Sequence, residues 1–286
     1  MPDDAAHRIV FFNGAYTPLA DAKISIMDRG FLFGDGVYEV SAVLDGRLVD
    51  NDAHLARLRR SLHELGIPNP HSDADWTQIE QELVALNRLN EGVVYFEVTR
   101  GVAERDFIYP EALTPTVVVF TQEKNIVASP LATRGAKIVT ARDLRWARRD
   151  IKSVALLAQV LAKQAAMAAG AAEVWMIEDG FVTEGGSSTA FVIGHDRRIV
   201  TRPLSPAILP GITRRAVMRL ADREALVVEE RAFTVAEAKA AAEVFYTSAS
   251  SFVVPVVSID GEIIGNGDPG PLTRQLSEIY VDFARG

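Results

Sequence analysis

Lys152 stands out in this sequence as a potential nucleophile. It directly precedes Ser153, which can cap a helix whose apolar residues recur at helical spacing over the following positions. A lysine at such a helix start faces the positive end of the helix dipole, and Arg148 and Arg149 add further positive charge. Both effects favour the neutral, nucleophilic form of the amine. The same pattern also fits an ordinary solvated lysine, so the local sequence leaves the two interpretations open.

One carboxylate and two segments rich in hydrogen-bond donors, further along the chain, could also take part in catalysis or ligand binding. Glu184 follows a predicted strand and precedes two glycines, a placement that exposes it to a cleft or to solvent. The segment 209–215 opens a predicted helix, where glycine, a threonine hydroxyl and free backbone N–H groups can form a phosphate site. The segment 247–251 is a hydroxyl-rich turn that can supply further donors.

The lysine, the separate carboxylate and the phosphate site at a helix start together favour pyridoxal phosphate over a nucleotide triphosphate. That cofactor needs an amine for a Schiff base, an anion site, and a partner for its pyridine nitrogen. The sequence contains neither a Gly-x-x-x-x-Gly-Lys nor a Gly-x-Gly-x-x-Gly pattern, which would indicate nucleotide binding. We also find no metal-binding motif and no Ser/His/Asp set, so we expect no metal at the site.

The composition narrows the class of protein further. The chain has 286 residues, which favours two domains, and its net charge of −8 argues against nucleic acid as the main partner. It contains no cysteine, which excludes disulfides and thiolate catalysis. No apolar run approaches the ~20 residues of a membrane span, and the first twenty residues show no signal pattern. We therefore expect a cytoplasmic protein without a membrane segment.

The elements that must position these residues alternate between strands and helices. Hydrophobic patterns and turn residues predict strands at 8–12, 37–44, 92–99, 116–121, 137–140, 173–178, 181–183, 189–193, 244–246 and 252–259. They predict helices at 53–65, capped by Asn51-Asp52, and at 76–86, 153–169, 212–224 and 271–285. A long loop at 100–110 is of the kind that often covers a site. We expect an N-terminal α+β domain at 1–124, an irregular linker at 125–134, and a β-rich C-terminal domain at 135–286 that carries the lysine.

Seven motifs in one order resemble the fold type IV pyridoxal-phosphate aminotransferases, most closely the D-amino acid aminotransferases. They are Asp28-Arg29-Gly30, Gly34-Asp35-Gly36-Val37-Tyr38-Glu39, Val98-Thr99-Arg100-Gly101, Asp150-Ile151-Lys152-Ser153, Thr183-Glu184-Gly185, Gly211-Ile212-Thr213-Arg214 and Thr247-Ser248. The resemblance spans nearly the whole chain. It implies a two-domain α+β fold with the cofactor, pyridoxal 5'-phosphate, in the interdomain cleft, and a homodimer.

The resemblance also implies roles for individual residues. It implies three catalytic residues: Lys152 would be the Schiff-base lysine and proton shuttle, Glu184 would pair with the pyridinium nitrogen, and Tyr38 would lie near Lys152 and the ring oxygen. Tyr38 would also contact the substrate. Leu209 would pack on the ring, and Glu39 would support Lys152. The phosphate would be held by Arg57, by Gly211, Ile212 and Thr213 at the helix start, and by Ser248 and Ala249 in the turn. Arg105 would bind the substrate carboxylate from the neighbouring subunit.

Two positions depart from the family pattern. The D-amino acid enzymes place a histidine two residues after the carboxylate-binding arginine, where this chain has Phe107. A threonine common in the phosphate turn is Ala249 here, so only its backbone N–H can serve. Branched-chain enzymes instead bind the substrate carboxylate near the phosphate, which here corresponds to the turn from Ser248 to Ser250.

The predicted reaction is a ping-pong transfer of the amino group from a D-amino acid to a 2-oxo acid. Three alternatives remain open from the sequence. The chain could be a branched-chain L-amino acid or (R)-amine transaminase of the same fold, a lyase of the aminodeoxychorismate type, or a non-catalytic pyridoxal-binding protein. The last is disfavoured because Lys152, Glu184 and Tyr38 are all present.

Overall fold

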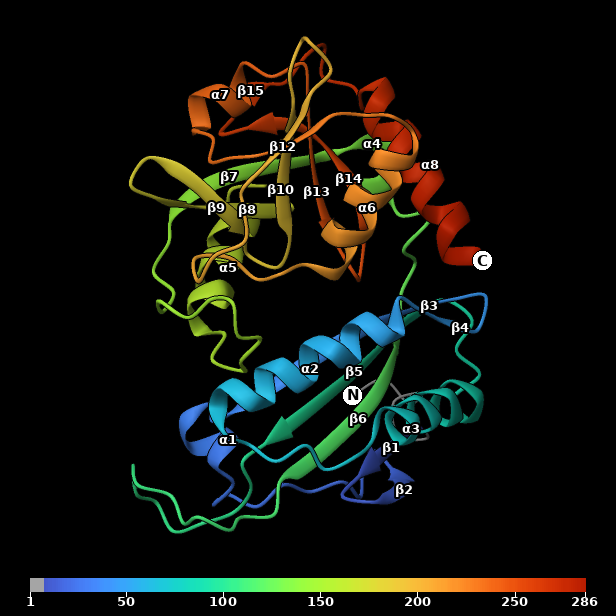
Figure 1. Cartoon of the computed structure of the whole chain (residues 1–286), viewed down its shortest axis with the longest axis vertical. Helices are drawn as coiled ribbons and strands as arrows, with labels where there is room; N and C mark the ends of the chain where they lie inside the picture. The colour runs from blue at the N-terminus through green and yellow to red at the C-terminus, as the bar shows by residue number, and fades with distance from the viewer. Residues whose placement is uncertain (1–7) are drawn as a thin grey trace. The chain divides into compact units, whose positions relative to one another are not determined.

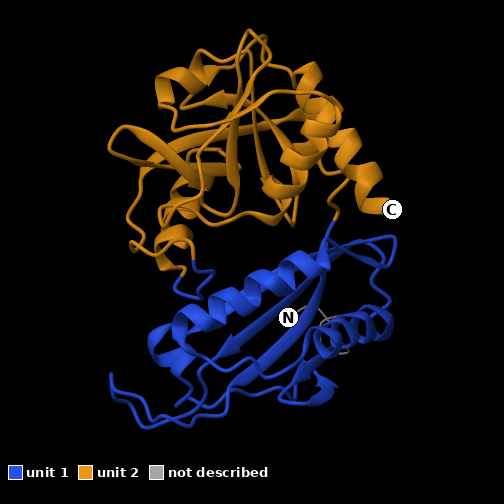
Figure 2. Ribbon diagram, viewed as in Figure 1, with its two compact units in different colours: residues 1–124, 151–155 blue, residues 125–150, 156–286 orange. Residues whose placement is uncertain are grey.

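The computed structural model describes residues 8–286 and divides into two compact units (Figure 2). Unit 1 is Met1–Lys124 with Ile151–Ala155, and unit 2 is Asn125–Asp150 with Leu156–Gly286. The short segment that contains Lys152 therefore belongs with unit 1, whereas the sequence analysis placed it in the C-terminal domain. The first seven residues of the predicted domain 1–124 lie outside the described residues, and the domain limits stay a prediction.

Unit 1 is built on a six-stranded antiparallel sheet in the order β2-β1-β6-β5-β3-β4 (Figure 1). Its strands are β1 (Ile9–Phe12), β2 (Ala15–Pro18), β3 (Gly36–Leu44), β4 (Arg47–Val49), β5 (Gly92–Thr99) and β6 (Thr116–Glu123). The Asn13-Gly14 turn between β1 and β2 has positive φ angles at both residues, which asparagine and glycine tolerate. The predicted strand pairing of 92–99 with 116–121 is confirmed.

Three helices complete unit 1: α1 (Arg29–Phe33), α2 (Asn51–Leu65) and α3 (Asp73–Leu86). Helix α2 packs on β3, while α3 packs on β1 and β6. The predicted cap of α2 is wrong, because Asp50 is the N-cap residue and Asn51 already lies inside the helix. Helix α3 begins three residues earlier than predicted, since Ser72 and Asp75 form a capping box.

The interior face of β3 carries polar groups in the middle of an otherwise apolar core. Alternate residues of a strand share one face, and here Val37 and Val43 join the core while Glu39 and Ser41 are fully buried between them. Burying a charged group is costly unless it is paired, so the residues of α2 opposite this face must compensate for Glu39.

Unit 2 contains a nine-stranded mixed sheet in the order β12-β11-β10-β13-β14-β7-β8-β9, with β15 paired to β14. Its strands are β7 (Ala136–Arg142), β8 (Glu173–Glu178), β9 (Phe181–Gly185), β10 (Thr189–Ile193), β11 (Ile199–Thr201), β12 (Val228–Glu230), β13 (Glu243–Ser248), β14 (Phe252–Ile259) and β15 (Glu262–Ile263). Helices α4 (Pro130–Arg134), α5 (Leu157–Ala168), α6 (Ile212–Arg223), α7 (Val235–Lys239) and α8 (Pro271–Arg285) surround it (Figure 1). The sheet encloses an aliphatic and aromatic core.

Two sequence predictions in unit 2 need correction. Helix α5 begins at Leu157 with Leu156 as its N-cap residue, so Ser153 caps nothing and Lys152 does not lie at a helix start. The dipole argument for Lys152 therefore does not hold. The predicted linker 125–134 contains the one-turn helix α4, whose first turn is capped by the Ser129 hydroxyl. That helix is too short to show a hydrophobic period in the sequence.

Within residues 8–286, no helix combines the length and the apolar character that a membrane span needs.

Candidate active site

Lys152 is held in unit 1 by backbone pairing rather than by a helix. Strand β4 covers only residues 42–44 of one edge of β3, and the segment 151–155 pairs with the start of that edge through a bridge between Val37 and Ser153. The Tyr38 N–H donates to the Lys152 carbonyl at 3.0 Å, and the Val154 N–H donates to the Gly36 carbonyl at 3.1 Å. Backbone groups of β3 that β4 leaves unpaired thus hold the backbone of Lys152 in place.

The Lys152 side chain lies against Tyr38. Its Nζ is 4.0 Å from the centre of the Tyr38 ring, within the range of a cation–π interaction. The Tyr38 ring in turn stacks on Tyr95, with ring centres 5.5 Å apart. The structure thus brings together two of the three predicted catalytic residues.

A buried charge network lies on the interior side of β3. Arg57 donates to the Glu39 carboxylate from Nε at 2.7 Å and from Nη2 at 2.8 Å, and His54 Nδ1 lies 2.8 Å from the same group. Burial raises the pKa of Glu39, but Arg57 and His54 outweigh it and lower that pKa to about 2. Burial, aided by Arg57 and Lys152, lowers the pKa of His54 despite Glu39. His54 is therefore neutral near neutral pH, and its Nδ1–H donates to Glu39.

Glu184 lies at the end of β9, in the interior of unit 2. Its Oε1 accepts a hydrogen bond from Arg145 Nη1, and its Oε2 accepts one from the Leu209 N–H at 3.0 Å. Asp143 accepts from Arg145 Nε at 3.0 Å and from Nη2 at 2.7 Å, so the guanidinium is shared between two carboxylates. Burial raises the pKa of Glu184, and Arg145 and Leu209 only partly oppose it.

The predicted phosphate segments of unit 2 lie near one another. Gly211 is the N-cap residue of α6 and offers no side-chain cap, which leaves the first N–H groups of the helix available. A Cβ at Gly211 would come within 2.6 Å of the Thr189 hydroxyl. Thr189 pairs with Thr247 in the neighbouring strand, directly before the turn 248–251. The Thr247 hydroxyl is buried and has no hydrogen-bond partner among the described residues.

Arg57, the remaining predicted phosphate residue, belongs to unit 1 and binds Glu39 as described above. In the turn of unit 2, the Ser248 and Ser251 hydroxyls are 2.6 Å apart, and Ala249 and Ser250 lie between them. The predicted substrate residues Arg105 and Phe107 lie on the exposed loop between β5 and β6. Among residues 8–286, no hydrogen bond joins Arg105 to Tyr38.

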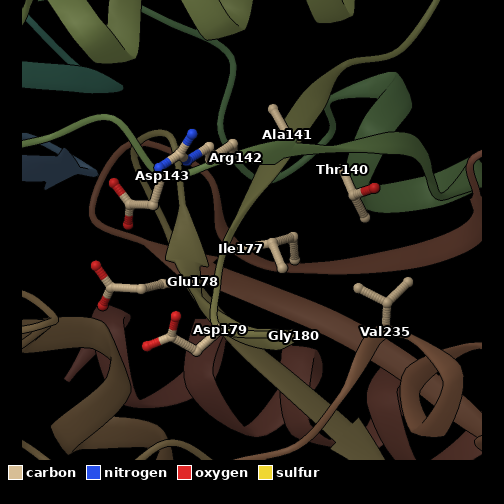
Figure 3. A pocket seen from close by; sticks show the side chains of 9 residues that line it. All are labelled: Thr140, Ala141, Arg142, Asp143, Ile177, Glu178, Asp179, Gly180 and Val235. Carbon is tan, nitrogen blue, oxygen red and sulfur yellow. The ribbon is translucent and has the colours of Figure 1, made fainter.

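A separate pocket of about 730 Å³ lies in unit 2 at the end of β7 and the β8–β9 hairpin. Figure 3 shows the carboxyl groups of Asp143, Glu178 and Asp179 on one side of it and the apolar Ile177 and Val235 on the other. The pocket is lined by none of the predicted cofactor residues, although Asp143 also belongs to the Arg145–Glu184 network.

The sequence analysis missed Arg145, which binds Glu184, and Asp143, which shares the Arg145 guanidinium. A signal was present, because the two residues have opposite charges at positions i and i+2, which share a face where the chain is extended. That spacing alone, however, does not reveal the carboxylate 39 residues further on that Arg145 also binds.

Known proteins resemble this chain in sequence and in fold. The family model "Amino-transferase class IV" matches residues 36–259. A D-alanine aminotransferase of Bacillus licheniformis is 43% identical over 269 residues, covering 93% of this chain and 94% of that protein. One from Staphylococcus aureus (strain N315) is 39% identical over 275 residues, covering 96% and 97%.

Solved structures agree with this result. The branched-chain aminotransferase from Thermoproteus uzoniensis, solved with norvaline, has a TM-score of 0.86 and 23% identity, covering 96% of this chain and 93% of that one. The branched-chain amino acid aminotransferase from Escherichia coli has a TM-score of 0.88 and 22% identity, covering 97% and 94%. At these identities both structures show a shared fold alone. The family model, the close relatives and the shared α+β fold together establish that this chain belongs to the class IV aminotransferases.

Proposed function

We propose that this chain is a pyridoxal 5'-phosphate-dependent transaminase that moves the amino group of a D-amino acid to a 2-oxo acid. The observation that carries the proposal is the 43% identity to a D-alanine aminotransferase over 93% of the chain. The branched-chain enzymes share the fold at lower identity, so the D-amino acid assignment is preferred over the L-amino acid alternative.

The residues present are compatible with that cofactor. Free N–H groups at α6 and the unpartnered Thr247 hydroxyl, judged among residues 8–286, suit a phosphate. A carboxylate has about four acceptor positions, so Glu184 can accept a further proton donor beyond its bonds to Arg145 and Leu209. The Lys152 amine, held against the Tyr38 ring, is the nucleophile that would attach the cofactor.

Each residue then has a definite task. When bound, the cofactor supplies an electron sink for the reaction. Lys152 would remove the proton from the α-carbon of the amino donor. In the second half-reaction it would deliver a proton to the α-carbon of the new amino acid. Glu184 would keep a proton on the ring nitrogen, and the α6 amides with Ser248 and Ala249 would bind the phosphate. Leu209 would pack on the ring, and Arg57 would contribute to phosphate binding.

Recognition of the substrate depends on Arg105 in this proposal. A guanidinium can bind a carboxylate through two parallel hydrogen bonds without help from another residue. Phe107 offers no donor where the D-amino acid enzymes have a histidine, and it is 80% exposed. We therefore expect D-amino acids to bind weakly, and a second activity on (R)-amines, which carry no carboxylate.

Borohydride reduction and peptide mapping test the site. We expect a yellow protein in which reduction fixes the pyridoxyl group on Lys152, and we expect Lys152→Ala to lose transamination by roughly a thousandfold or more. Lys137→Ala, which removes an exposed lysine of β7, is the matched control and should keep full activity. Label on another lysine, or full activity in Lys152→Ala, would refute the assignment.

A substrate panel tests the specificity. D- and L-amino acids and (R)-amines are offered with 2-oxoglutarate or pyruvate as acceptor. Turnover of D-alanine supports the proposal, and preference for L-leucine would place the carboxylate site at the turn 248–250 instead. Repeated turnover of aminodeoxychorismate to pyruvate, in a separate reaction without an acceptor, would indicate a lyase. Homodimer formation and a cytoplasmic location stay predictions, and light scattering of the purified protein tests the first.

A further inference from the structure

A buried charge cluster forms the base of the loop that carries Arg105. The Asp35 carboxylate accepts hydrogen bonds from Arg29 Nε at 2.8 Å and from Arg100 Nε and Nη2 at 2.8 and 3.0 Å. Burial raises the pKa of Asp35, but the two guanidinium groups outweigh it and lower that pKa. The cluster therefore stays charged, and it ties α1 to the end of β5, where the loop begins.

The same arginines also hold the far part of the loop. Arg29 Nη1 donates to the Asp106 carbonyl at 2.7 Å, and the Arg29 N–H donates to the Gly101 carbonyl at 2.9 Å. The Tyr109 ring lies over both guanidinium groups, 3.8 Å from Arg100 Cζ and 5.4 Å from Arg29 Cζ. Residues on either side of Arg105 are thus fixed to the body of unit 1.

Phe33 links this cluster to the exposed tip of the loop. Its ring centre lies 4.7 Å from Arg29 Cζ, 5.3 Å from Arg105 Cζ and 5.6 Å from the ring centre of Phe107. Phe33 is the last residue of α1, and Gly34 ends the helix in the left-handed conformation with φ 67°. The ring is therefore rigidly presented to the two loop side chains.

We propose that Phe33 is a positioning residue that sets where the Arg105 guanidinium lies and thereby the affinity for the substrate carboxylate. This inference rests on the proposed function, in which Arg105 binds that carboxylate. An exposed arginine loses much rotamer entropy when a ligand fixes it, and contact with the Phe33 ring reduces that loss in advance. Phe107, in place of the family histidine, packs on the same ring and adds to the ordering of the loop.

Phe33→Leu tests the proposal, because it keeps apolar volume but removes the aromatic face. Phe31→Leu is the matched control: Phe31 lies on the same helix, is 71% exposed, and has no ring or cation–π contact with the described residues. In the holoenzyme we expect Phe33→Leu to raise the KM for D-alanine roughly 5- to 10-fold with kcat almost unchanged. The KM for (R)-1-phenylethylamine and the visible absorption of the cofactor should stay at the parent values.

Trypsin cleavage after Arg105 gives a readout that does not depend on activity. We expect faster cleavage in Phe33→Leu than in Phe31→Leu, because the loop is less ordered. Equal cleavage and equal KM values in the two variants would overturn the inference, as would a matching rise in the KM for the amine. If the parent does not use D-alanine but cleavage is still faster in Phe33→Leu, the proposed substrate is wrong and the role of Phe33 in placing Arg105 stands.

Discussion

Glu39 in unit 1 and Glu184 in unit 2 are both buried beside an arginine, yet their pKa values shift in opposite directions. Arg57 and His54 lower the pKa of Glu39 to about 2 against the effect of burial. Burial prevails at Glu184 and raises its pKa, because Arg145 is shared with Asp143. The direction in which the pKa of a buried carboxyl group shifts thus depends on the hydrogen-bond donors that bind it.

This difference suggests different uses for the two groups. Glu39 receives two bonds from one guanidinium and a third from His54, so its charge is fully engaged in holding α2 against β3. Glu184 receives one bond from Arg145 and one backbone N–H, and its charged form is disfavoured. Glu184 is therefore suited to share a proton with a ligand, whereas Glu39 is suited to stabilise the fold.

The largest effect is expected from Glu39→Gln, which tests whether Glu39 stabilises the fold. It leaves the buried Arg57 without its carboxylate, and we expect the free energy of unfolding to fall by about 3–5 kcal/mol near pH 7. The pKa of Glu39 is lowered to about 2, so its contribution is present above its ordinary value of 4.5 and is lost as the pH falls toward 2. Urea unfolding at several pH values measures this, with the exposed Glu123→Gln as control. An unchanged midpoint near pH 7 would contradict the assignment.

Glu184→Gln tests the chemical side. A neutral amide cannot hold a proton on the ring nitrogen, so we expect the half-reaction with a D-amino acid to slow roughly 100-fold. The free energy of unfolding should change little, because burial already disfavours the charge of Glu184 and Arg145 keeps Asp143. Stopped-flow absorbance gives the rate. Glu178→Gln, on the neighbouring strand, should keep the parent rate, and a normal rate in Glu184→Gln would remove it from the site.

Glu80 extends the comparison to a buried carboxyl group without an arginine. Burial raises its pKa to about 8 against the opposing effects of Asn51 and Ser41, and Glu39 adds to the rise. Neither oxygen of Glu80 has a well-aligned hydrogen bond among the described residues. The folded state therefore keeps the proton that the unfolded chain loses above pH 4.5, and stability falls as the pH rises toward 8. We expect Glu80→Gln to remove about 2 kcal/mol of the stability loss between pH 5 and pH 7. Parallel pH profiles for both proteins would contradict this.

The smallest effect is expected where the charges are exposed. Arg59 and Asp73 form an ion pair with side chains 48% and 50% exposed. Arg59→Ala should change the free energy of unfolding by less than about 1 kcal/mol, and added salt should reduce the change further. A loss as large as that of Glu39→Gln would show that pairing alone, rather than burial, governs these carboxyl groups.

The sequence predicted the long elements well because their patterns are local. Strands at 92–99, 189–193 and 252–259 and the helix at 271–285 were predicted with the bounds that the structure has. Several elements of two to five residues, such as α1 and β11, were missed because so few residues show no clear period, although the five-residue strand β10 was found. Helix 153–169 was predicted from its apolar spacing, but its first four residues are diverted to pair with β3 or to lead into the helix.

The sequence by itself determined which groups are available for the chemistry: a lysine, a separate carboxylate, and donor-rich segments at a helix start and a turn. Residue identity and order carry that information, since each chemical task admits few side chains. Only the tertiary structure decided the environment of each group. It attached Lys152 to the free edge of β3, committed Glu39 to Arg57 and His54, and divided Arg145 between Asp143 and Glu184. These partners are far apart in the chain, and burial and pairing set the charge of a carboxyl group only after folding has brought them together.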